Sequence, residues 1–314
     1  MSFGIDIFVL LREEQILKEL RKAFAERYLP EHLFYWLPSS IQAWVALCRS
    51  TEYKNASRAS EVLRLAAPGI RQRCEGGTTL CGLGCGEGGK DLVLLQEFHD
   101  AGQPLRYIAA DFSQALLELA IDQSQKLVKS AAGLKLNVFD DEQLAVAGRL
   151  AREVGGCAIF SVLGNTLGAF GPQAFPSRLR QCCVAHDCFL FDGEIFSETS
   201  LAGYDNPTNR RFAWGPLTGV GITEEDGRLE FSTEALDDGL FGVSKHFVAG
   251  RNLRINVGGE WIDIRRGETL RMSNSIKYRN EATLLGFVER AGFKIEMKWT
   301  SSDNQFVLAF AKPS

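Results

Sequence analysis

The chain has few histidines, no long apolar run and no excess of basic charge, and each absence excludes a class of protein. Four histidines, with eight cysteines that form no C-x-x-C pair, offer too few ligands for a zinc site, so no metal is expected. No run of about 18 apolar residues occurs, so no membrane span is expected. The N-terminus lacks a basic segment and a small-residue cleavage site, so we expect a cytoplasmic protein with reduced thiols.

The charge balance is slightly acidic. The 314 residues include 35 Lys and Arg against 39 Asp and Glu, a net charge of −4, and no basic stripe is visible. A dedicated nucleic-acid binder usually carries such a stripe, so nucleic acid is not the expected partner. At 45% hydrophobic and 24% charged residues, the composition is that of a globular protein with one large domain or two smaller ones.

Apolar segments alternate with helical ones in the middle of the chain. Strands are predicted over 78–84, 105–112, 134–140, 156–166 and 188–196, with helices over 90–102, 113–127 and 142–153. This alternation is typical of an α/β fold whose parallel sheet is covered on both faces. The chain ends with a helix over 280–291 and two strands, 293–300 and 305–312, joined by a short turn as an antiparallel hairpin.

Two segments interrupt or precede this pattern. Residues 1–66 are predicted to be helical, with helices over 11–28, 41–48 and 59–66, the second of them capped by Ser39 or Ser40. Residues 197–270 begin with a predicted loop over 204–219. Period-two alternation then predicts antiparallel strands over 227–236, 244–250, 253–259 and 260–267, which would form an inserted lobe.

The segment "TLCGLGCGEGGKD" (79–91) lies between a predicted strand and a predicted helix. Gly84, Gly86 and Gly89 fit the G-x-G-x-x-G pattern of nucleotide-binding turns. A P-loop is disfavoured, because Asp91 stands where that motif needs Ser or Thr to hold magnesium. A dinucleotide fold needs an acid about 20 residues further on, which Asp111 could supply.

The terminal hairpin argues against a dinucleotide sheet and for the seven-stranded, Rossmann-like sheet of class I S-adenosylmethionine-dependent methyltransferases. In that fold the glycine loop passes under the methionine end of the cofactor. The acid after the second strand, here Asp111, takes the ribose hydroxyls. A residue after the third strand, here Asp140 or its neighbours Phe139 and Asp141, meets the adenine.

Several blocks resemble the histidine-specific Nα-methyltransferase family of ergothioneine biosynthesis. They are "LPEHLFYWLPSSIQAWVALCRSTEY", "LGCGEGGK", "YIAADFSQALLELA", "VLGNTLGAF", "GETLRMSNSIKY" and "AGFKIEMKWTSSDNQFVLAFAK". The resemblance implies a methyltransferase core at 67–196 and 271–314. It also implies a substrate lobe built from the N-terminal helical segment 1–66 and the insert 197–270.

The chain departs from the family at two substrate positions. Where the family's G-N-[FL] block has the asparagine that helps to hold histidine, this chain has Ala169, with Asn165 nearby. Where the family has a glutamate that recognises the imidazole, this chain has Ser273, although the family's serine is retained as Ser275. These departures predict an acceptor other than free histidine.

The fold and the resemblance together imply two sets of site residues, and no catalytic residue is assigned. Lys90 would either cap its helix or meet the cofactor carboxylate. Asp192 and Glu194, at the end of the fifth strand, would either face a ligand or only end the strand. The predicted cofactor-binding residues are Gly84, Cys85, Gly86, Lys90, Asp111, Phe112, Phe139, Asp140, Leu163 and Gly164. The predicted substrate-binding residues are Tyr35, Tyr53, Asn165, Thr166, Ala169, Tyr204, Ser273 and Ser275.

The sequence therefore predicts an S-adenosyl-L-methionine-dependent methyltransferase for a small amine or amino-acid-like acceptor. Three alternatives stay open. They are an NAD(P)-dependent oxidoreductase, a catalytically inactive homologue, and a nucleic-acid methyltransferase that uses a local basic face such as Arg210, Arg211, Arg265 and Arg266. The sequence leaves the oligomeric state undetermined.

Overall fold

The computed structural model describes residues 6–74, 77–153 and 156–314, which form two compact units. Unit 1 contains the described residues of Met1–Leu10, Asn55–Phe196 and Lys277–Ser314, and unit 2 contains Leu11–Lys54 and Ser197–Ile276. The chain thus crosses between units after residues 10, 54, 196 and 276, whereas the sequence placed boundaries after 66, 196 and 270. The structure has no boundary at residue 66, because α3 (Lys54–Arg73) is one continuous helix that passes through this position.

Unit 1 is built on one mixed sheet, whose described strands are ordered β1-β5-β4-β3-β6-β7-β14-β13. β14 runs antiparallel to both of its neighbours, β7 and β13, so the predicted terminal hairpin is confirmed. The described sheet has one strand more than the seven expected, because β1 adds to the edge beside β5. The strands are β1 (Ile7–Val9), β3 (Thr79–Leu83), β4 (Arg106–Asp111), β5 (Ser130–Lys135), β6 (Ala158–Val162), β7 (Cys188–Glu194), β13 (Phe293–Thr300) and β14 (Phe306–Pro313).

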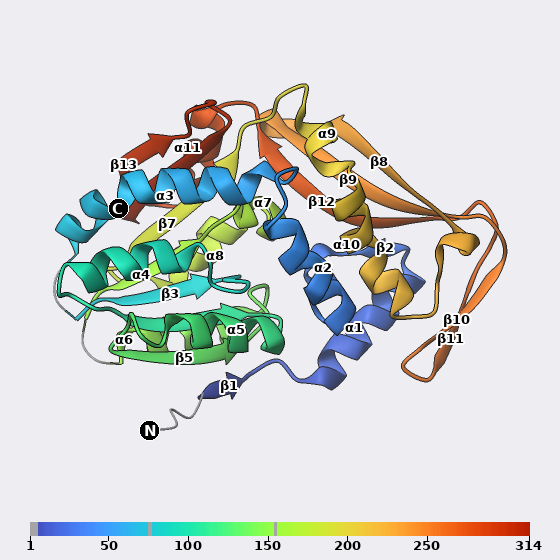
Figure 1. The fold of residues 1–314 in the computed structure, drawn as a ribbon, viewed down its shortest axis with the longest axis horizontal. Coiled ribbons are helices and arrows are strands. Elements are labelled where there is room, and N and C mark those ends of the chain that lie inside the picture. The colour runs from blue at the N-terminus through green and yellow to red at the C-terminus, as the bar shows by residue number, and fades with distance from the viewer. Residues whose placement is uncertain (1–5, 75–76, 154–155) are drawn as a thin grey trace. The chain divides into compact units, whose positions relative to one another are not determined.

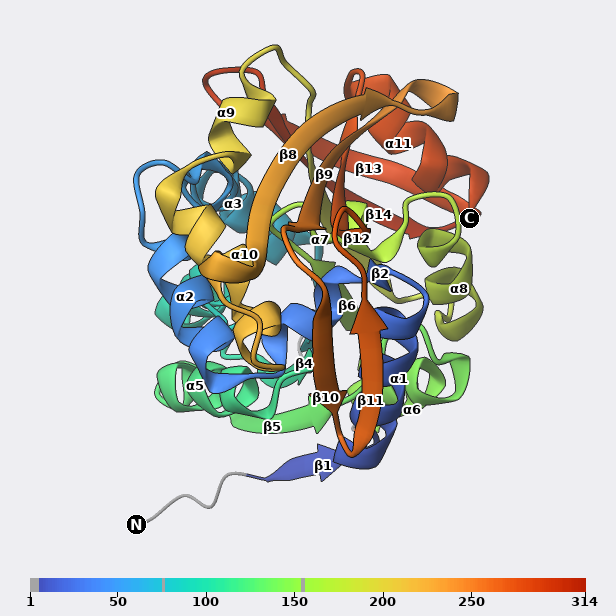
Figure 2. The same ribbon diagram turned by 90° about the vertical axis from the view of Figure 1, so that its right-hand side faces the viewer.

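Helices cover both faces of this sheet, as Figure 2 shows, with α3 and α5 on one side and α6, α8 and α11 on the other. Apolar side chains of α3, α4 and α5 form one buried cluster with β3, β4, β6, β7 and β14. Because both faces are covered, β3 and β7 are buried along their whole length, as expected for strands that read as continuous apolar runs. Besides α3, the described helices of unit 1 are α4 (Asp91–Asp100), α5 (Gln114–Ser124), α6 (Asp141–Arg152), α7 (Thr166–Phe170), α8 (Phe175–Cys182) and α11 (Glu281–Arg290).

The third predicted strand is displaced along the chain. The sequence placed it at 134–140, but β5 covers Ser130–Lys135 and pairs with β4 in the register Ala109↔Gly133. The residues after it turn instead, because Asn137 and Asp140 use their side chains to bond backbone N–H groups of the following segment. Short polar side chains of this kind favour turns and helix caps over strand continuation.

Unit 2 combines helices with strands (Figure 1), of which β8 and β9, and β10 and β11, pair antiparallel, whereas β2 pairs parallel with β12. One described sheet has the order β2-β12-β9-β8, and β10 and β11 form a separate hairpin. The helical elements are α1 (Glu13–Ala25), η1 (Glu31–Tyr35), α2 (Pro38–Cys48), α9 (Ser200–Tyr204), α10 (Pro207–Thr218), η2 (Glu224–Asp226) and η3 (Asp237–Gly239). The strands are β2 (Tyr28–Leu29), β8 (Gly227–Ala235), β9 (Leu240–Ala249), β10 (Leu253–Val257), β11 (Glu260–Ile264) and β12 (Thr269–Tyr278), the last of which continues into unit 1.

Two local predictions in unit 2 were wrong. Residues 204–219 are not a loop, because Asn206 caps α10 by accepting a bond from the Asn209 N–H at 2.9 Å, and Pro207 suits the first helical turn. Helix α2 is not capped by Ser39 or Ser40 but begins at Pro38 after Leu37, and Ser40 is buried inside the helix.

Within the described residues, none of the helices combines the length and apolarity needed to cross a bilayer.

Candidate cofactor and acceptor sites

The glycine loop between β3 and α4 depends on backbone conformations that glycine adopts most easily. Gly84, Gly86 and Gly88 have φ values of 68°, 57° and 83°, in the left-handed region. A Cβ at Gly84 would lie 2.8 Å from Cζ of Phe170, so the loop passes directly against that ring. The Gly84 N–H donates to the Ala110 carbonyl at 2.8 Å, which holds the loop beside the end of β4.

Asp111 ends β4 and braces this loop. Its Oδ2 accepts from the Gly86 N–H and its Oδ1 from the Ser113 N–H, both at 2.9 Å. Burial raises the pKa of the Asp111 carboxyl to about 6, although these two bonds oppose the rise. An ionised carboxylate has about four acceptor positions, so both oxygens can also accept from the two hydroxyls of a ribose. The neighbouring Phe112 is buried at the same edge.

Asp91, the residue that argued against a P-loop, lies beneath the loop and binds protein groups. Its Oδ2 accepts from the Tyr107 hydroxyl at 2.8 Å and its Oδ1 from the Ser161 hydroxyl at 2.9 Å. Burial raises the pKa of the Asp91 carboxyl to about 6. A Cβ at Gly82, in β3, would lie 2.2 Å from Asp91 Oδ2, so the buried Asp91 carboxylate leaves room only for glycine at this position. Asp91 therefore connects β3, β4, β6 and α4 in the core.

Lys90 occupies the N-cap position of α4, but its side chain makes no capping hydrogen bond. The side chain instead lies over Gly164, where an added Cβ would be 2.9 Å from Lys90 Cε. Gly164, with φ of 84°, follows β6. The ammonium charge lowers the pKa values of the three buried carboxyls of Asp91, Asp111 and Asp192, although burial keeps all three above the ordinary value.

The loop after β6 is held by Asp192 of β7. Oδ2 and Oδ1 of Asp192 accept from the N–H groups of Gly164 and Asn165, each at 2.7 Å. Burial raises the pKa of the Asp192 carboxyl to about 7. Asn165 is itself buried and left-handed, with φ of 60°, and Thr166 donates its hydroxyl to the Leu163 carbonyl at 2.7 Å. Ala169, at the end of this segment, is exposed.

The loop after β5 uses Asp140 to cap α6. Asp140 Oδ1 accepts from the N–H groups of Glu142 and Gln143 at 3.0 and 3.1 Å, and Oδ2 accepts from the Gln143 side chain at 3.1 Å. The Phe139 ring meets the Phe170 ring edge-on at 5.8 Å. The ten predicted cofactor residues therefore end or follow β3, β4, β5 and β6 at one edge of the sheet, where parallel strands of this architecture place their ligands.

Unit 2 brings several predicted acceptor residues together. The rings of Tyr53 and Tyr204 meet edge-on at 6.2 Å, and Tyr204 Oη lies 3.2 Å from Ser275 Oγ. Tyr35 contacts Trp44 at 5.2 Å, and Trp44 contacts Tyr53 at 6.0 Å. These side chains form one aromatic wall within the unit.

The sequence prediction missed three residues of this region. Phe212 packs against Tyr35 and Trp44, both at 5.4 Å, and the buried Lys245 ammonium lies 5.3 Å from the Phe212 ring. The richness of 31–66 in aromatic residues was a signal for Trp44. Phe212 and Lys245 lie far from residues 31–66 in the sequence, so no local sequence pattern connects them to this aromatic segment.

Ser273 has an unusual conformation within β12. Its φ is 53°, its residue surface is 1% exposed, and its hydroxyl has no hydrogen-bond partner among the described residues. Before Ser273 the buried residues of the strand are the even-numbered Leu270 and Met272, and from Ser273 onward the odd-numbered Ser273 and Ser275 are buried instead. The left-handed residue therefore shifts the strand's alternation by one position and places both serines on its buried side.

The glycine-loop segment contains two cysteines. Cys81 and Cys85 are buried, and burial raises the pKa of each thiol above the ordinary value. Among the residues that the structure describes, no three His, Cys, Asp or Glu side chains are placed to hold a metal ion.

The mixed sheet with its antiparallel terminal strand, together with the glycine loop and Asp111, defines a class I S-adenosylmethionine-dependent methyltransferase fold. The chain belongs to the histidine-specific, S-adenosylmethionine-dependent methyltransferase family, whose model matches residues 12–209 and 233–313. It is an enzyme of that family, with a small-molecule substrate and S-adenosyl-L-methionine as cofactor.

Several known proteins are similar to this chain. The N-methyltransferase fsqC of Aspergillus fumigatus is 23% identical over 289 residues, which cover 90% of this chain and 78% of that protein. An S-adenosylmethionine-dependent methyltransferase structure from Clostridium acetobutylicum has a TM-score of 0.42 at 11% identity, covering 83% of this chain and 92% of that one. The amino pentose methyltransferase CalS10 from Micromonospora echinaspora has a TM-score of 0.37 at 12% identity, covering 87% and 96%.

Proposed function

We propose that this enzyme transfers a methyl group from S-adenosyl-L-methionine to the amine of an amino-acid-like acceptor other than free histidine. The observation that carries the proposal is the state of Ser273, a buried hydroxyl without a partner among the described residues. At this position the family resemblance implies a glutamate that recognises the imidazole of histidine, and this chain has the neutral hydroxyl of Ser273 instead. A hydrogen bond to a charged group contributes about 1.5–3 kcal/mol, so its loss would weaken imidazole binding by roughly ten- to a hundredfold.

Ala169 supports the same proposal. It is exposed and has no amide, so it cannot replace the hydrogen bonds of an asparagine at that position. Asn165 and Thr166 supply polar groups four and three residues earlier, but a bond from the Glu194 N–H at 3.0 Å already fixes the direction of Asn165 Oδ1. We infer that the acceptor meets a different polar pattern from the one that holds histidine.

The cofactor would be held by the residues at the carboxyl edge of the sheet. Asp111 would accept from the ribose hydroxyls, and the glycine loop at Gly84, Cys85 and Gly86 would allow close approach of the methionine portion. Lys90 would meet its carboxylate. Phe139, with its ring, and Asp140, through the α6 cap that it forms, would line the adenine side, and Phe112, Leu163 and Gly164 would complete the lining of the cofactor site. When bound, this cofactor supplies a methyl group on a positively charged sulfur, so the chain's own task is mostly positioning.

The aromatic wall of unit 2 would bind the acceptor. Tyr35, Tyr53 and Tyr204 present aromatic surface, and the Tyr204–Ser275 pair and Ser273 present hydroxyls. Such a combination favours an acceptor with an apolar or aromatic body and a neutral hydrogen-bonding group. The fungal relative fsqC is an N-methyltransferase, which supports nitrogen as the acceptor atom.

A calorimetric titration tests the proposal. Free histidine is titrated into the enzyme in the presence of saturating S-adenosylhomocysteine, with the S-adenosylhomocysteine titration itself as the control for a folded cofactor site. We expect cofactor-product binding and no measurable histidine binding. Micromolar or tighter binding of histidine would show that the acceptor assignment is wrong.

A further inference from the structure

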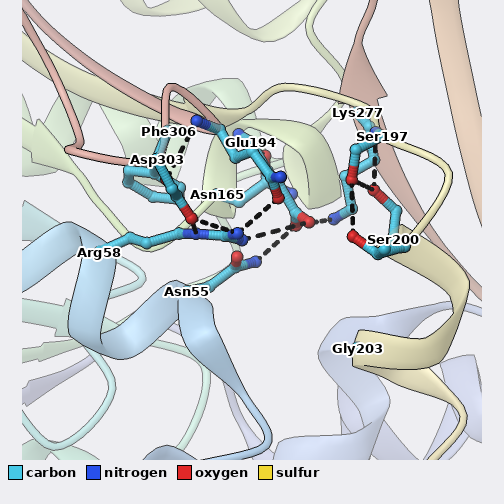
Figure 3. A network of polar contacts seen from close by, with 12 residues as sticks. Asn55, Arg58, Asn165, Glu194, Ser197, Ser200, Gly203, Lys277, Asp303 and Phe306 are labelled. Atoms are coloured by element: carbon cyan, nitrogen blue, oxygen red, sulfur yellow. Dashed lines mark hydrogen bonds and ion pairs between the residues drawn. The ribbon is translucent and has the colours of Figure 1, made fainter.

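Glu194, at the end of β7, is a buried acid bonded by residues from distant parts of the chain (Figure 3). Its Oε2 accepts from the Asn55 side chain at 2.7 Å and lies 2.9 Å from the Lys277 ammonium. The Arg58 guanidinium lies 3.9 Å from Oε1. The side chains of Glu194 and Lys277 are 5% and 0% exposed, so this ion pair is withdrawn from water.

The network continues from Arg58 to a second carboxylate. Arg58 also pairs with Asp303 at 2.6 Å and donates to that carboxylate through Nε at 2.7 Å. Arg58 and Lys277 thus lie in one set of ion pairs with Glu194 and Asp303. Because a buried charge is costly to leave without a partner, each member holds the others in place.

Two of the side chains that bind Glu194, those of Asn55 and Lys277, come from positions next to the boundaries between the two units. Asn55 is the first residue of unit 1 after the crossing at residue 54, and Lys277 is the first after the crossing at 276. Glu194 itself lies two residues before the crossing at 196. A bond from the Phe196 N–H to the Tyr278 carbonyl, at 2.8 Å, also connects the last two crossings. Three of the four crossings thus meet at one carboxylate.

The segments that leave this point carry proposed acceptor residues after very few positions. Tyr53 is two residues before Asn55, and Ser275 is two residues before Lys277. Two residues of extended chain span at most about 7 Å, so fixing Asn55 and Lys277 limits where Tyr53 and Ser275 can lie. Inside unit 2, both of these residues contact Tyr204.

The same residue also orients the loop after β6. The Glu194 N–H donates to Asn165 Oδ1 at 3.0 Å, and the Asn165 N–H donates to Asp192. Glu194 therefore acts on Asn165 through its backbone and on Asn55 and Lys277 through its side chain.

We propose that Glu194 is a positioning residue, whose carboxylate fixes the chain segments that carry Tyr53 and Ser275 while its backbone fixes Asn165. The assignment of these residues to the acceptor rests on the proposed function. The positioning itself can be measured without any acceptor, so the failure of one claim is distinguishable from the failure of the other.

The test uses the full chain labelled with 3-fluorotyrosine and followed by fluorine NMR. The chain has six tyrosines, and the Tyr53 and Tyr204 signals are assigned from separate Tyr53→Phe and Tyr204→Phe samples. In Glu194→Gln we expect both signals to shift or broaden by more than their linewidth. The Tyr107 signal, from the core of unit 1, should stay in place, and S-adenosylhomocysteine affinity by calorimetry should be unchanged within error.

Asp187→Asn is the matched control. Asp187 is a fully buried acid of unit 1 that pairs with Arg152 at 2.7 Å and accepts from backbone N–H groups, but it lies away from the crossings. Unmoved Tyr53 and Tyr204 signals in Glu194→Gln would overturn the proposal. Equal movement in Asp187→Asn would also overturn it, because general destabilisation would then be the cause.

A milder variant keeps the test usable if Glu194→Gln does not fold. Asn55→Ala removes one donor and leaves Lys277 and Arg58 to neutralise the carboxylate. We expect the same two signals to move in the same direction by a smaller amount, and unmoved signals would overturn the proposal here as well.

Discussion

The carboxylate of Asp111 accepts a hydrogen bond from the backbone N–H of Gly86 at 2.9 Å, so the acid after β4 and the glycine loop form one structural element. Glu87 raises the pKa of this carboxyl and Lys90 lowers it, but burial is the largest effect and brings the value to about 6. The acid that we propose for the ribose hydroxyls therefore titrates close to neutral pH.

Cofactor-product affinity should depend on this titration. The ionised carboxylate accepts hydrogen bonds at both oxygens and the protonated form loses part of that capacity, so S-adenosylhomocysteine affinity should rise as the pH passes upward through about 6. Asp111→Asn should weaken binding about tenfold or more and flatten the pH dependence, because a charged acceptor is lost. Calorimetry from about pH 5 to about pH 8 measures both. An unchanged pH profile in the variant would assign the titration to another group, such as Asp192.

In the enzyme without cofactor, the raised pKa of Asp111 should make the fold less stable as the pH rises, whereas it should make cofactor-product binding tighter. A carboxyl whose folded-state pKa is raised from 3.8 to about 6 stabilises the fold below the lower value, and this contribution is lost as the pH rises through the higher one. The Tm of Asp111→Asn relative to the unsubstituted enzyme should therefore increase between about pH 4 and about pH 7. Differential scanning fluorimetry tests this, and a constant difference would contradict it.

Gly84→Ala should damage the site more than a substitution at another left-handed glycine. Its Cβ would lie 2.8 Å from the Phe170 ring, whereas Gly102, with a similar φ of 71°, has no neighbour within 4 Å of an added Cβ. Gly102→Ala thus reports the backbone cost alone, about 1–2 kcal/mol. We expect Gly84→Ala to lower Tm further and to weaken S-adenosylhomocysteine binding, and equal effects of the two variants would show that contact with Phe170 is unimportant.

Ser273→Gly should slow turnover of the acceptor and raise the stability of the fold. Glycine adopts the left-handed conformation without the strain that a side chain brings, which favours the fold by up to about 1 kcal/mol. The acceptor, however, loses the hydroxyl. Ser273→Ala is the matched control, because it removes the hydroxyl and keeps the strain. Both variants should turn over the preferred acceptor more slowly and only Gly should raise Tm, so full turnover in both would exclude Ser273 from acceptor binding.

The cysteines of the glycine loop should be unreactive in the folded enzyme. Burial raises the pKa of the Cys85 thiol well above its ordinary value, whereas a hydrogen bond from Cys188 lowers the pKa of the half-exposed Cys157 thiol. Brief alkylation with iodoacetamide, followed by peptide mass spectrometry, should modify Cys157 before Cys85. Rapid loss of the Cys85 thiol would contradict the described burial of the loop.

The core of unit 1 was predictable because its signals are local. Buried strands, a glycine turn and a terminal hairpin follow from short patterns, and the strand over Thr79–Leu83 was placed within one residue of its observed bounds. Helix α10 was missed because glycine and proline suggested a loop, while the decisive cap of Asn206 is a single side-chain contact. The Glu194 network could not be predicted, since Asn55, Lys277 and Asp303 become its neighbours only through the tertiary fold.

The most direct test of the proposed function is a competition between acceptors. The enzyme is incubated with S-adenosyl-L-methionine and an equimolar mixture of free histidine, aromatic amino acids and aromatic amines, and the products are identified by mass spectrometry. The structure of unit 2 around Ser273 predicts an N-methylated product from a member of the mixture other than histidine. Methylated histidine as the main product would contradict it.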